Sequence, residues 1–139
     1  DFYKVASYEL MWLDLFEKIA ETKLPLVFSD GMATADEVER TLSFCMKRGI
    51  TDITLLHCNS AYPTPVKDVN LKGINTLWSM AQKIGEGMFS VKTGLSDHSV
   101  NPGVIYRSVF TYGAEMIEFH LDIDGKGAEY SGGHCWMPE

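Results

Sequence analysis

Two histidines follow apolar runs that have the character of buried strands, and imidazole can bind a metal ion or transfer a proton. His98 follows the run Phe89 to Leu95, and His120 follows the run Met116 to Phe119. A segment with helical character separates the two runs, so the strands are predicted to be parallel neighbours. Parallel neighbours deliver their carboxyl ends to the same edge of a sheet. We therefore expect His98 and His120 to converge on one metal site.

The rest of the chain alternates between strand-like and helix-like segments. Strands are predicted at Phe2 to Ser7, Leu24 to Ser29, Asp52 to Cys58, Phe89 to Leu95 and Ala114 to Phe119. Helices are predicted at Glu9 to Thr22, from the Thr34/Glu37 capping box to Gly49, from about Ile74 to Gly85, and at Val104 to Tyr112. Residues 122–139 are rich in glycine and have no clear period, so they are expected to be a loop.

Five strands in βα alternation predict an α/β fold with a parallel sheet and helices outside it. A complete (β/α)8 barrel takes about 250 residues, so five units cannot close the cylinder. We expect residues 1–139 to form one partial TIM-barrel domain of a longer protein. The alternative is an open, doubly wound sheet, although the chain has no glycine-rich first turn of the GxGxxG type.

The composition narrows the range of partners. The formal net charge is -7, which argues against nucleic acid or an anionic membrane surface as the main partner. No apolar run approaches the roughly 20 residues that span a bilayer. The three cysteines lack CxxC spacing, which favours a reducing cytoplasm over a disulfide framework.

Five short runs resemble, in order, the signatures of the sialic acid synthase family. They are Tyr3 to Glu9 (YKVASYE), Phe28 to Thr34 (FSDGMAT), Leu55 to Pro65 (LLHCNSAYPTP), Gly94 to His98 (GLSDH) and Ile117 to His120 (IEFH). The resemblance covers the chain from Tyr3 to about His120. It implies that the chain contains strands four to eight of that family's TIM barrel.

The resemblance implies a condensation of phosphoenolpyruvate with an N-acetylated amino sugar such as N-acetylmannosamine. The products would be a nine-carbon 2-keto sugar acid and phosphate. His98 and His120 would hold Mn2+ or Mg2+, which polarises the aldehyde oxygen of the sugar. Two imidazoles alone would suit several metals. The full-length enzyme is expected to be a cytoplasmic homodimer, and the chain by itself is expected to be inactive.

The same resemblance assigns the substrate-binding residues. Lys4 matches the family's phosphoenolpyruvate-binding lysine. The serines predicted to complete the phosphate cradle are Ser7, Ser29, Ser60 and Ser96. Glu9 and Tyr62 resemble residues on the sugar side, where a carboxylate and a phenol can orient hydroxyls or shuttle a proton. Asp97 is expected to hold one tautomer of His98. His57 and Cys58 are interpreted as packing residues of the barrel interior.

The last loop departs from the family pattern. Most members carry Pro-Gly-Pro-Asp there, whereas Ser131 stands at the position of the aspartate. Glu129 and His134 are the candidates for its role. Asp30 likewise stands where the family usually has threonine. These differences leave open a pseudaminate-like or legionaminate-like substrate. The alternative function is a degenerate barrel that binds sugar or phosphate without turnover.

Overall fold

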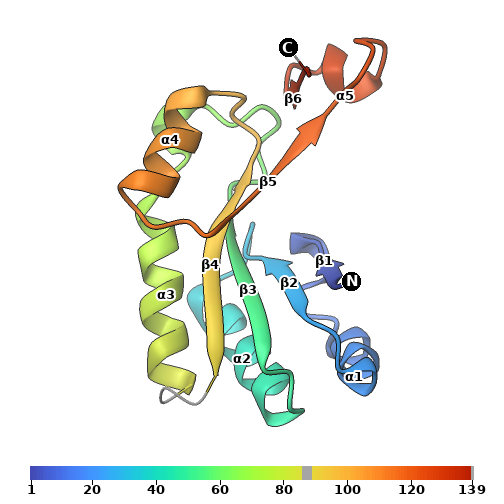
Figure 1. The fold of residues 1–139 in the computed structure, drawn as a ribbon, viewed down its shortest axis with the longest axis vertical. Helices are drawn as coiled ribbons and strands as arrows, with labels where there is room; N and C mark the ends of the chain where they lie inside the picture. Colours follow the sequence, from blue (N-terminus) through green and yellow to red (C-terminus); the bar gives the residue numbers. More distant parts are fainter. Residues whose placement is uncertain (86–88, 139) are drawn as a thin grey trace.

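The computed structural model describes residues 1–85 and 89–138 as a layer of parallel strands covered by helices (Figure 1). The strands are β1 (Tyr3–Val5), β2 (Leu26–Ser29), β3 (Asp52–Cys58), β4 (Ser90–Asp97), β5 (Met116–Leu121) and β6 (Cys135–Trp136). The α-helices are α1 (Leu13–Thr22), α2 (Ala35–Lys47), α3 (Lys72–Gly85), α4 (Pro102–Phe110) and α5 (Ala128–Ser131). Two short 3-10 helices are η1 (Ser7–Glu9) and η2 (Val66–Asp68).

The strands within the described ranges form one sheet in the order β1-β2-β3-β4-β5-β6, and each neighbouring pair is parallel. A doubly wound sheet reverses its strand order part-way along. The order here follows the sequence throughout, so the doubly wound alternative is wrong.

The sheet is curled. Lys4 lies on β1 and Glu118 on β5, and three strands separate them in the sheet. In a flat sheet they would be roughly 19 Å apart, because neighbouring strands are spaced by about 4.8 Å. The Nζ of Lys4 nevertheless lies 3.3 Å from Oε2 of Glu118. The strands therefore wrap into a parallel half-barrel with a concave inner face, as expected for part of a TIM barrel.

The hydrophobic core lies between the sheet and the outer helices. Phe16 of α1, Leu42 of α2 and Ile53 of β3 are fully buried. The Phe16 ring packs edge-on against Phe28 of β2, with ring centres 5.6 Å apart. A second cluster joins the upper part of the sheet to α3 and α4 through Val69, Ile74, Leu95, Val104 and Ala114. The helices thus bury the convex face, and the concave face bears a group of polar side chains toward the carboxyl ends of the strands.

The helix starts follow local capping chemistry. The predicted capping box before α2 is confirmed: the Thr34 side chain accepts from the backbone N-H of Glu37, and Glu37 accepts from the backbone N-H of Thr34. The prediction of one helix from Glu9 to Thr22 is wrong. The predicted first residue, Glu9, is the last residue of the 3-10 helix η1, and α1 begins only at Leu13. The chain bends between them because Leu10 turns into the core, where it is 2% exposed.

The strands β4 and β5 extend beyond their apolar runs. Pairing continues through Ser96 with Glu118 and through Asp97 with Phe119. His120 pairs with Cys135 of β6, so His120 lies inside β5 and not after it. Hydrophobic pattern marks burial, whereas strand length is set by backbone pairing. The predicted strand ends were therefore too early.

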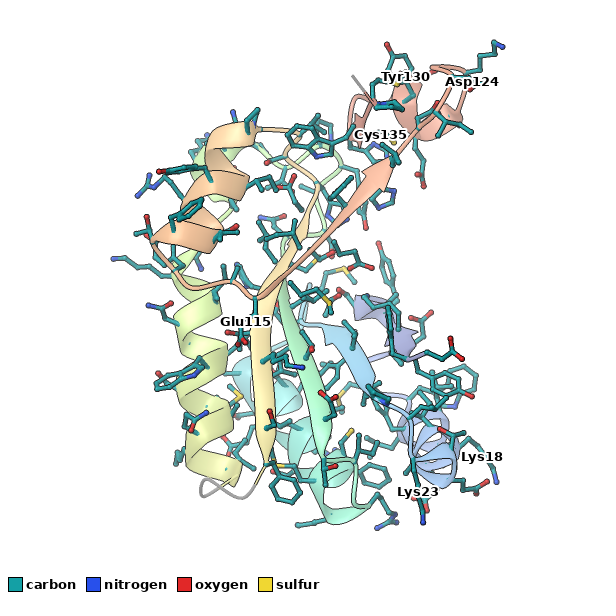
Figure 2. All side chains as sticks on the ribbon, viewed as in Figure 1. Lys18, Lys23, Glu115, Asp124, Tyr130 and Cys135 are labelled. Carbon is teal, nitrogen blue, oxygen red and sulfur yellow. The ribbon has the colours of Figure 1, made fainter. Side chains whose placement is uncertain are left out.

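The prediction that residues 122–139 are a loop is wrong in part, since they contain α5 and β6. The carboxylate of Asp122 accepts from the backbone N-H groups of Asp124, Gly125 and Gly127. This turn sends the chain back so that β6 pairs with β5 at the far end of the sheet (Figure 2). A two-residue strand has no period to detect. In the described part of the chain, helices are too short or too polar to span a bilayer.

Candidate functional site

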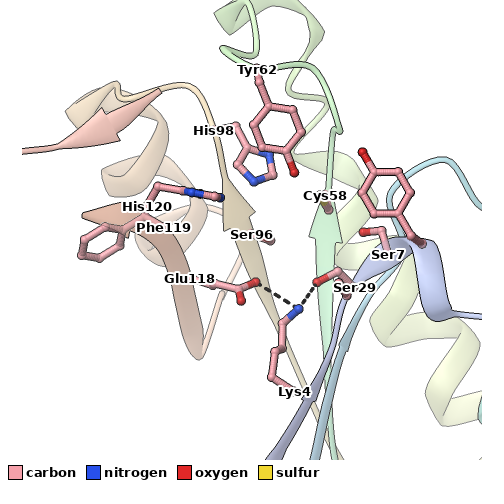
Figure 3. A pocket seen from close by; sticks show the side chains of 12 residues that line it. Lys4, Ser7, Ser29, Cys58, Tyr62, Ser96, His98, Glu118, Phe119 and His120 are labelled. Carbon is pink, nitrogen blue, oxygen red and sulfur yellow. Dashed lines mark hydrogen bonds and ion pairs between the residues drawn. The ribbon is translucent and has the colours of Figure 1, made fainter. Parts of the chain in front are cut away.

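A pocket of about 340 Å³ lies on the concave face, toward the carboxyl ends of the strands (Figure 3). The residues that line it are Lys4, Ala6, Ser7, Tyr8, Ser29, Cys58, Tyr62, Ser96, His98, Glu118, Phe119 and His120. Side chains alternate between the two faces of a strand. Ser96 and His98 therefore share the inner face, as do Glu118 and His120. The carboxyl ends of strands are also where TIM barrels build their active sites.

His98 and His120 face each other across the mouth of this pocket (Figure 3), and their ring centres are 5.1 Å apart. The Nδ1 of His98 lies 2.9 Å from the carbonyl oxygen of Asn59. The Nδ1 of His120 lies 2.7 Å from Oε2 of Glu129. These oxygens only accept, so each Nδ1-H donates, and in the neutral imidazole Nε2 then carries the lone pair. Metal-nitrogen bonds are about 2 Å long, so the two rings are close enough to share one cation.

The group that orients His98 is the Asn59 carbonyl, and the expectation for Asp97 is wrong. Asp97 points to the other side of β4. Its carboxylate accepts from the backbone N-H and the hydroxyl of Ser99 and from the backbone N-H of Val100. Asp97 therefore closes the turn after β4. Strand alternation explains the error, because residues adjacent in a strand cannot share a face.

Tyr62 covers the histidine pair. Its ring centre lies 4.1 Å from that of His98 and 5.9 Å from that of His120. Burial, followed by the nearby Cys58, raises the pKa of Tyr62. The phenol therefore stays protonated at neutral pH and can donate a hydrogen bond to a bound ligand.

Lys4 is held between two polar groups in the floor of the pocket. Its Nζ donates to Oγ of Ser29 at 2.8 Å and forms the ion pair with Glu118 (Figure 3). Glu118 belongs to the IEFH run, and the sequence predicted no role for it. The signal was its two-residue spacing from His120, which places both on the inner face. The pocket thus contains the Lys4 ammonium, and its positive charge is balanced by the carboxylate of Glu118, from which three strands separate it in the sheet.

The predicted serines are only partly brought together. Ser7, Ser29 and Ser96 line the pocket, but Ser60 does not. The Oγ of Ser7 accepts from the backbone N-H of Gly31 at 3.0 Å. A Cβ at Gly31 would collide with Oγ of Ser60 and Oγ of Ser7, so both hydroxyls lie against Gly31. Only glycine fits between the two hydroxyls.

Glu9 does not reach the pocket lining either. It ends η1 and is half-buried, and the pocket residue of that turn is its neighbour Tyr8. The 3-10 geometry of η1 turns successive side chains by about 120°. A helix start at Glu9 would have oriented its carboxylate differently.

His57 and Asp30 form a polar pair outside the pocket, and the interior-packing interpretation of His57 is wrong. The Nδ1 of His57 lies 3.1 Å from Oδ2 of Asp30, and its Nε2 lies 3.0 Å from the carbonyl oxygen of Val69. Its ring packs on Gly73 of α3, where a Cβ would overlap it. Burial lowers the pKa of His57, but the hydrogen bond and charge of Asp30 outweigh burial and raise it. Cys58, the next residue, does face the pocket.

The end of the chain brings further side chains to the same mouth. Glu129 contacts His120 as described, and the His134 ring centre lies 5.1 Å from that of Tyr62 and 5.3 Å from that of His120. The hydrogen bond that His120 donates lowers the pKa of Glu129. Both residues named as candidates for the missing loop aspartate therefore lie beside the histidine pair.

Comparison with known proteins identifies the family. Residues 1–132 match the sequence model of the NeuB family. The chain belongs to the NeuB family. It is 43% identical over 119 residues to the pseudaminic acid synthase of Helicobacter pylori, covering 86% of this chain and 32% of that protein. It is 33% identical over 131 residues to the N-acetylneuraminate-9-phosphate synthase of Drosophila melanogaster, covering 93% of this chain and 33% of that protein.

A solved NeuB-type structure has the same fold. The crystal structure of N-acetylneuraminic acid synthetase from Leptospira borgpetersenii, in complex with citrate, superposes with a TM-score of 0.82 at 32% sequence identity. The match covers 97% of this chain and 44% of that chain. The chain spans about a third of the length of the curated relatives it matches. The NeuB half-barrel therefore carries the pocket, and the resemblance to sialic acid synthases is confirmed.

Proposed function

We propose that the protein containing this chain condenses phosphoenolpyruvate with an N-acetylated amino sugar to give a nonulosonic acid and phosphate. The observation that carries the proposal is the pair of imidazoles, each with an available Nε2, beside the Lys4 ammonium in one pocket of a NeuB-family barrel. Relatives named as pseudaminic acid and N-acetylneuraminate-9-phosphate synthases support an enzyme over the binding-only alternative.

The strands β1 to β5 are proposed to be strands four to eight of an eight-stranded barrel. Support comes from the sequential parallel order, the curled sheet and the match to the Leptospira synthetase. In this assignment residues 1–139 are part of one catalytic barrel domain. The remaining strands would close the pocket on the side where the concave face now opens.

His98 and His120 would hold the divalent cation, for which we propose Mn2+ in preference to Mg2+. Imidazole nitrogen suits transition metals, whereas Mg2+ prefers oxygen ligands. When bound, the cation supplies Lewis-acid polarisation of the sugar aldehyde. The Asn59 carbonyl and the Glu129 carboxylate keep both imidazoles in the tautomer that presents Nε2.

Lys4 is proposed to bind phosphoenolpyruvate as a point charge. Ser29 already accepts from its ammonium, and Ser7 and Ser96 add hydroxyl donors around the same space. Glu118 holds the ammonium in the pocket until an anionic substrate competes for it. Ser60, whose hydroxyl lies against Gly31 on the same side as that of Ser7, is retained as a prediction from the family resemblance.

Tyr62 is proposed to contact the amino sugar, because its protonated hydroxyl and exposed ring lie directly above the histidine pair. A sugar-side role for Glu9 stays a prediction from the family resemblance. N-Acetylmannosamine, and sugars of the pseudaminate and legionaminate type, are the substrate candidates. We also retain as predictions a homodimer, a cytoplasmic location, and neither nucleic acid nor membrane as a partner.

The test measures phosphate release by the intact protein from phosphoenolpyruvate with each candidate sugar, in Mn2+ and in chelator. Release should require both the sugar and the metal, and the substitution His98→Ala should lower it by about 100-fold or more. The matched control is His57→Gln, because His57 lies on the helical side of β3 and should not affect metal dependence.

Two results would contradict the proposal in different ways. Phosphate release that persists in chelator, or that persists in the His98→Ala variant, would contradict the metal role. Release that no sugar stimulates, in a protein that still binds phosphoenolpyruvate, would favour the binding-only alternative.

A further inference from the structure

A cluster of potential metal ligands lies beside the proposed catalytic pair, on the tail of the chain. The members are His120 of β5, Glu129 of α5, His134 and Cys135 of β6. One ligand atom from each lies within 4.8 Å of every other. Four ligands at metal-bond lengths of about 2.0 to 2.3 Å are separated from one another by roughly 3.3 to 3.8 Å in a tetrahedron. Small side-chain movements would therefore bring all four onto one cation.

His134 gives independent evidence of a missing ligand. Its side chain is buried, with 8% of the residue exposed, and its Nδ1 has no hydrogen-bond partner among the described residues. Leaving a buried polar atom unpaired is destabilising. Its ring also packs tightly on Gly132, where a Cβ would approach Nδ1 to 3.0 Å. The ring thus lies against the backbone of Gly132, and its Nδ1 has no hydrogen-bond partner among the described residues.

Cys135 distinguishes this cluster chemically from the His98–His120 pair. Its thiol is buried and lies 3.9 Å from Oε2 of Glu129. A thiolate is a soft ligand that selects Zn2+ or Co2+ over Mg2+ and Mn2+. Coordination would release the thiol proton to solvent. The ligand set of two imidazoles, one thiolate and one carboxylate matches tetrahedral zinc chemistry.

The described part of the tail contains only short elements. The strand β6 has two residues, and α5 has four. A metal bound by Glu129, His134 and Cys135 would join α5 and β6, and His120 would tie both to β5. Figure 2 shows Cys135 at the junction of β5 and the tail.

We propose that His120, Glu129, His134 and Cys135 form a zinc-class site that fastens the carboxyl-terminal segment to the mouth of the barrel. Metal binding at this site does not require phosphoenolpyruvate chemistry, so it can be tested independently of the proposed synthase activity. It shares His120 with the pair proposed to bind Mn2+, and a neutral imidazole has one lone pair, so the two cations would be alternatives at His120.

The test uses Co2+ as a spectroscopic substitute for Zn2+ in the intact reduced protein after metal removal. A cobalt-thiolate charge-transfer absorption in the near ultraviolet should appear at one Co2+ per chain, and added Zn2+ should abolish it. Cys135→Ser should remove this absorption, and His134→Gln should weaken Co2+ binding by about 10- to 100-fold. Circular dichroism of each variant checks that it remains folded.

Two control variants make the assignment specific. Cys58 is 8% exposed, as is Cys135, but it lies in the pocket and outside the cluster. The Cys58→Ser variant should therefore keep the cobalt-thiolate absorption. His98→Gln should also retain this absorption while losing Mn2+ binding, which separates the two sites. Wild-type protein without a cobalt-thiolate absorption would overturn the proposal. So would an absorption that depends on Cys58 and survives Cys135→Ser.

Discussion

The substitution Gly94→Ala should separate two strands that carry the proposed site. Gly94 of β4 pairs with Met116 of β5. A Cβ at Gly94 would overlap the carbonyl oxygen of Met116 and lie 2.9 Å from Cδ2 of Leu56. The Leu56 side chain can rotate slightly. The Met116 carbonyl is backbone and cannot move without moving β5.

The cost can be worked out from these contacts. Overpacking a tight site costs about 1 to 3 kcal/mol. Lengthening the neighbouring β4–β5 hydrogen bonds adds about 1 kcal/mol. We expect Gly94→Ala to lower the free energy of unfolding by about 3 kcal/mol. Because β5 also carries His120, its displacement from His98 should weaken Mn2+ binding by about tenfold.

The free energy of unfolding is measured by urea denaturation, and Mn2+ affinity by titration. The matched control is Gly103→Ala in the first turn of α4, where a Cβ would meet only the end of the Asn101 side chain, at 3.1 Å. Alanine favours a helix over glycine by about 0.5 to 1 kcal/mol, so the control should change stability by no more than about 1 kcal/mol. Equal stability of the Gly94→Ala and Gly103→Ala variants would refute the close approach of β4 and β5.

Three further predictions concern charge and capping. In the fold, Asp30 raises the pKa of His57, so the stabilisation by this pair is fully present below about pH 6.5 and is lost as pH rises through the folded pKa. Asp30→Asn should therefore lower the free energy of unfolding, measured by urea denaturation, by about 1 to 2 kcal/mol more at about pH 5.5 than at about pH 9. An equal loss at the two pH values would contradict the pairing. Thr34→Ala should lower the free energy of unfolding by about 1 kcal/mol, and Thr34→Ser, which keeps the cap, by much less; equal losses would count against the capping box. Lys4→Gln should raise the KM for phosphoenolpyruvate by about tenfold or more with little change for the sugar, because one charged contact is lost; an unchanged KM would exclude Lys4 from substrate binding.

Local patterns predicted the elements well where the signal was strong. Asp52–Cys58 was predicted to the residue, because a buried parallel strand is a continuous apolar run. The box of Thr34 and Glu37 marked the start of α2, because capping is completed within four residues. The tail was missed for the opposite reason. The strand β6 exists only because the turn at Asp122 returns it to β5.

The candidate site also combines residues that the sequence predicted with residues that it missed. The convergence of His98 and His120 followed from strand order alone, because parallel neighbours end at one edge. The role predicted for Asp97 failed, because adjacency in sequence puts residues of a strand on opposite faces. Glu118 shared the inner face with His120, and applying the same alternation to β5 would have found it.

Short stretches of sequence determined the order of strands and helices, the helix caps and the histidines at the strand ends. Periodicity and capping act between residues that are near each other in the chain, so these features have local signals. The tertiary structure alone decided how closely the sheet curls, which brings the Lys4 ammonium to the Glu118 carboxylate. It also decided that the returning tail places His134 and Cys135 against His120. Such contacts depend on the summed twist of many strands and on a turn of the backbone, and neither has a local signature in the sequence.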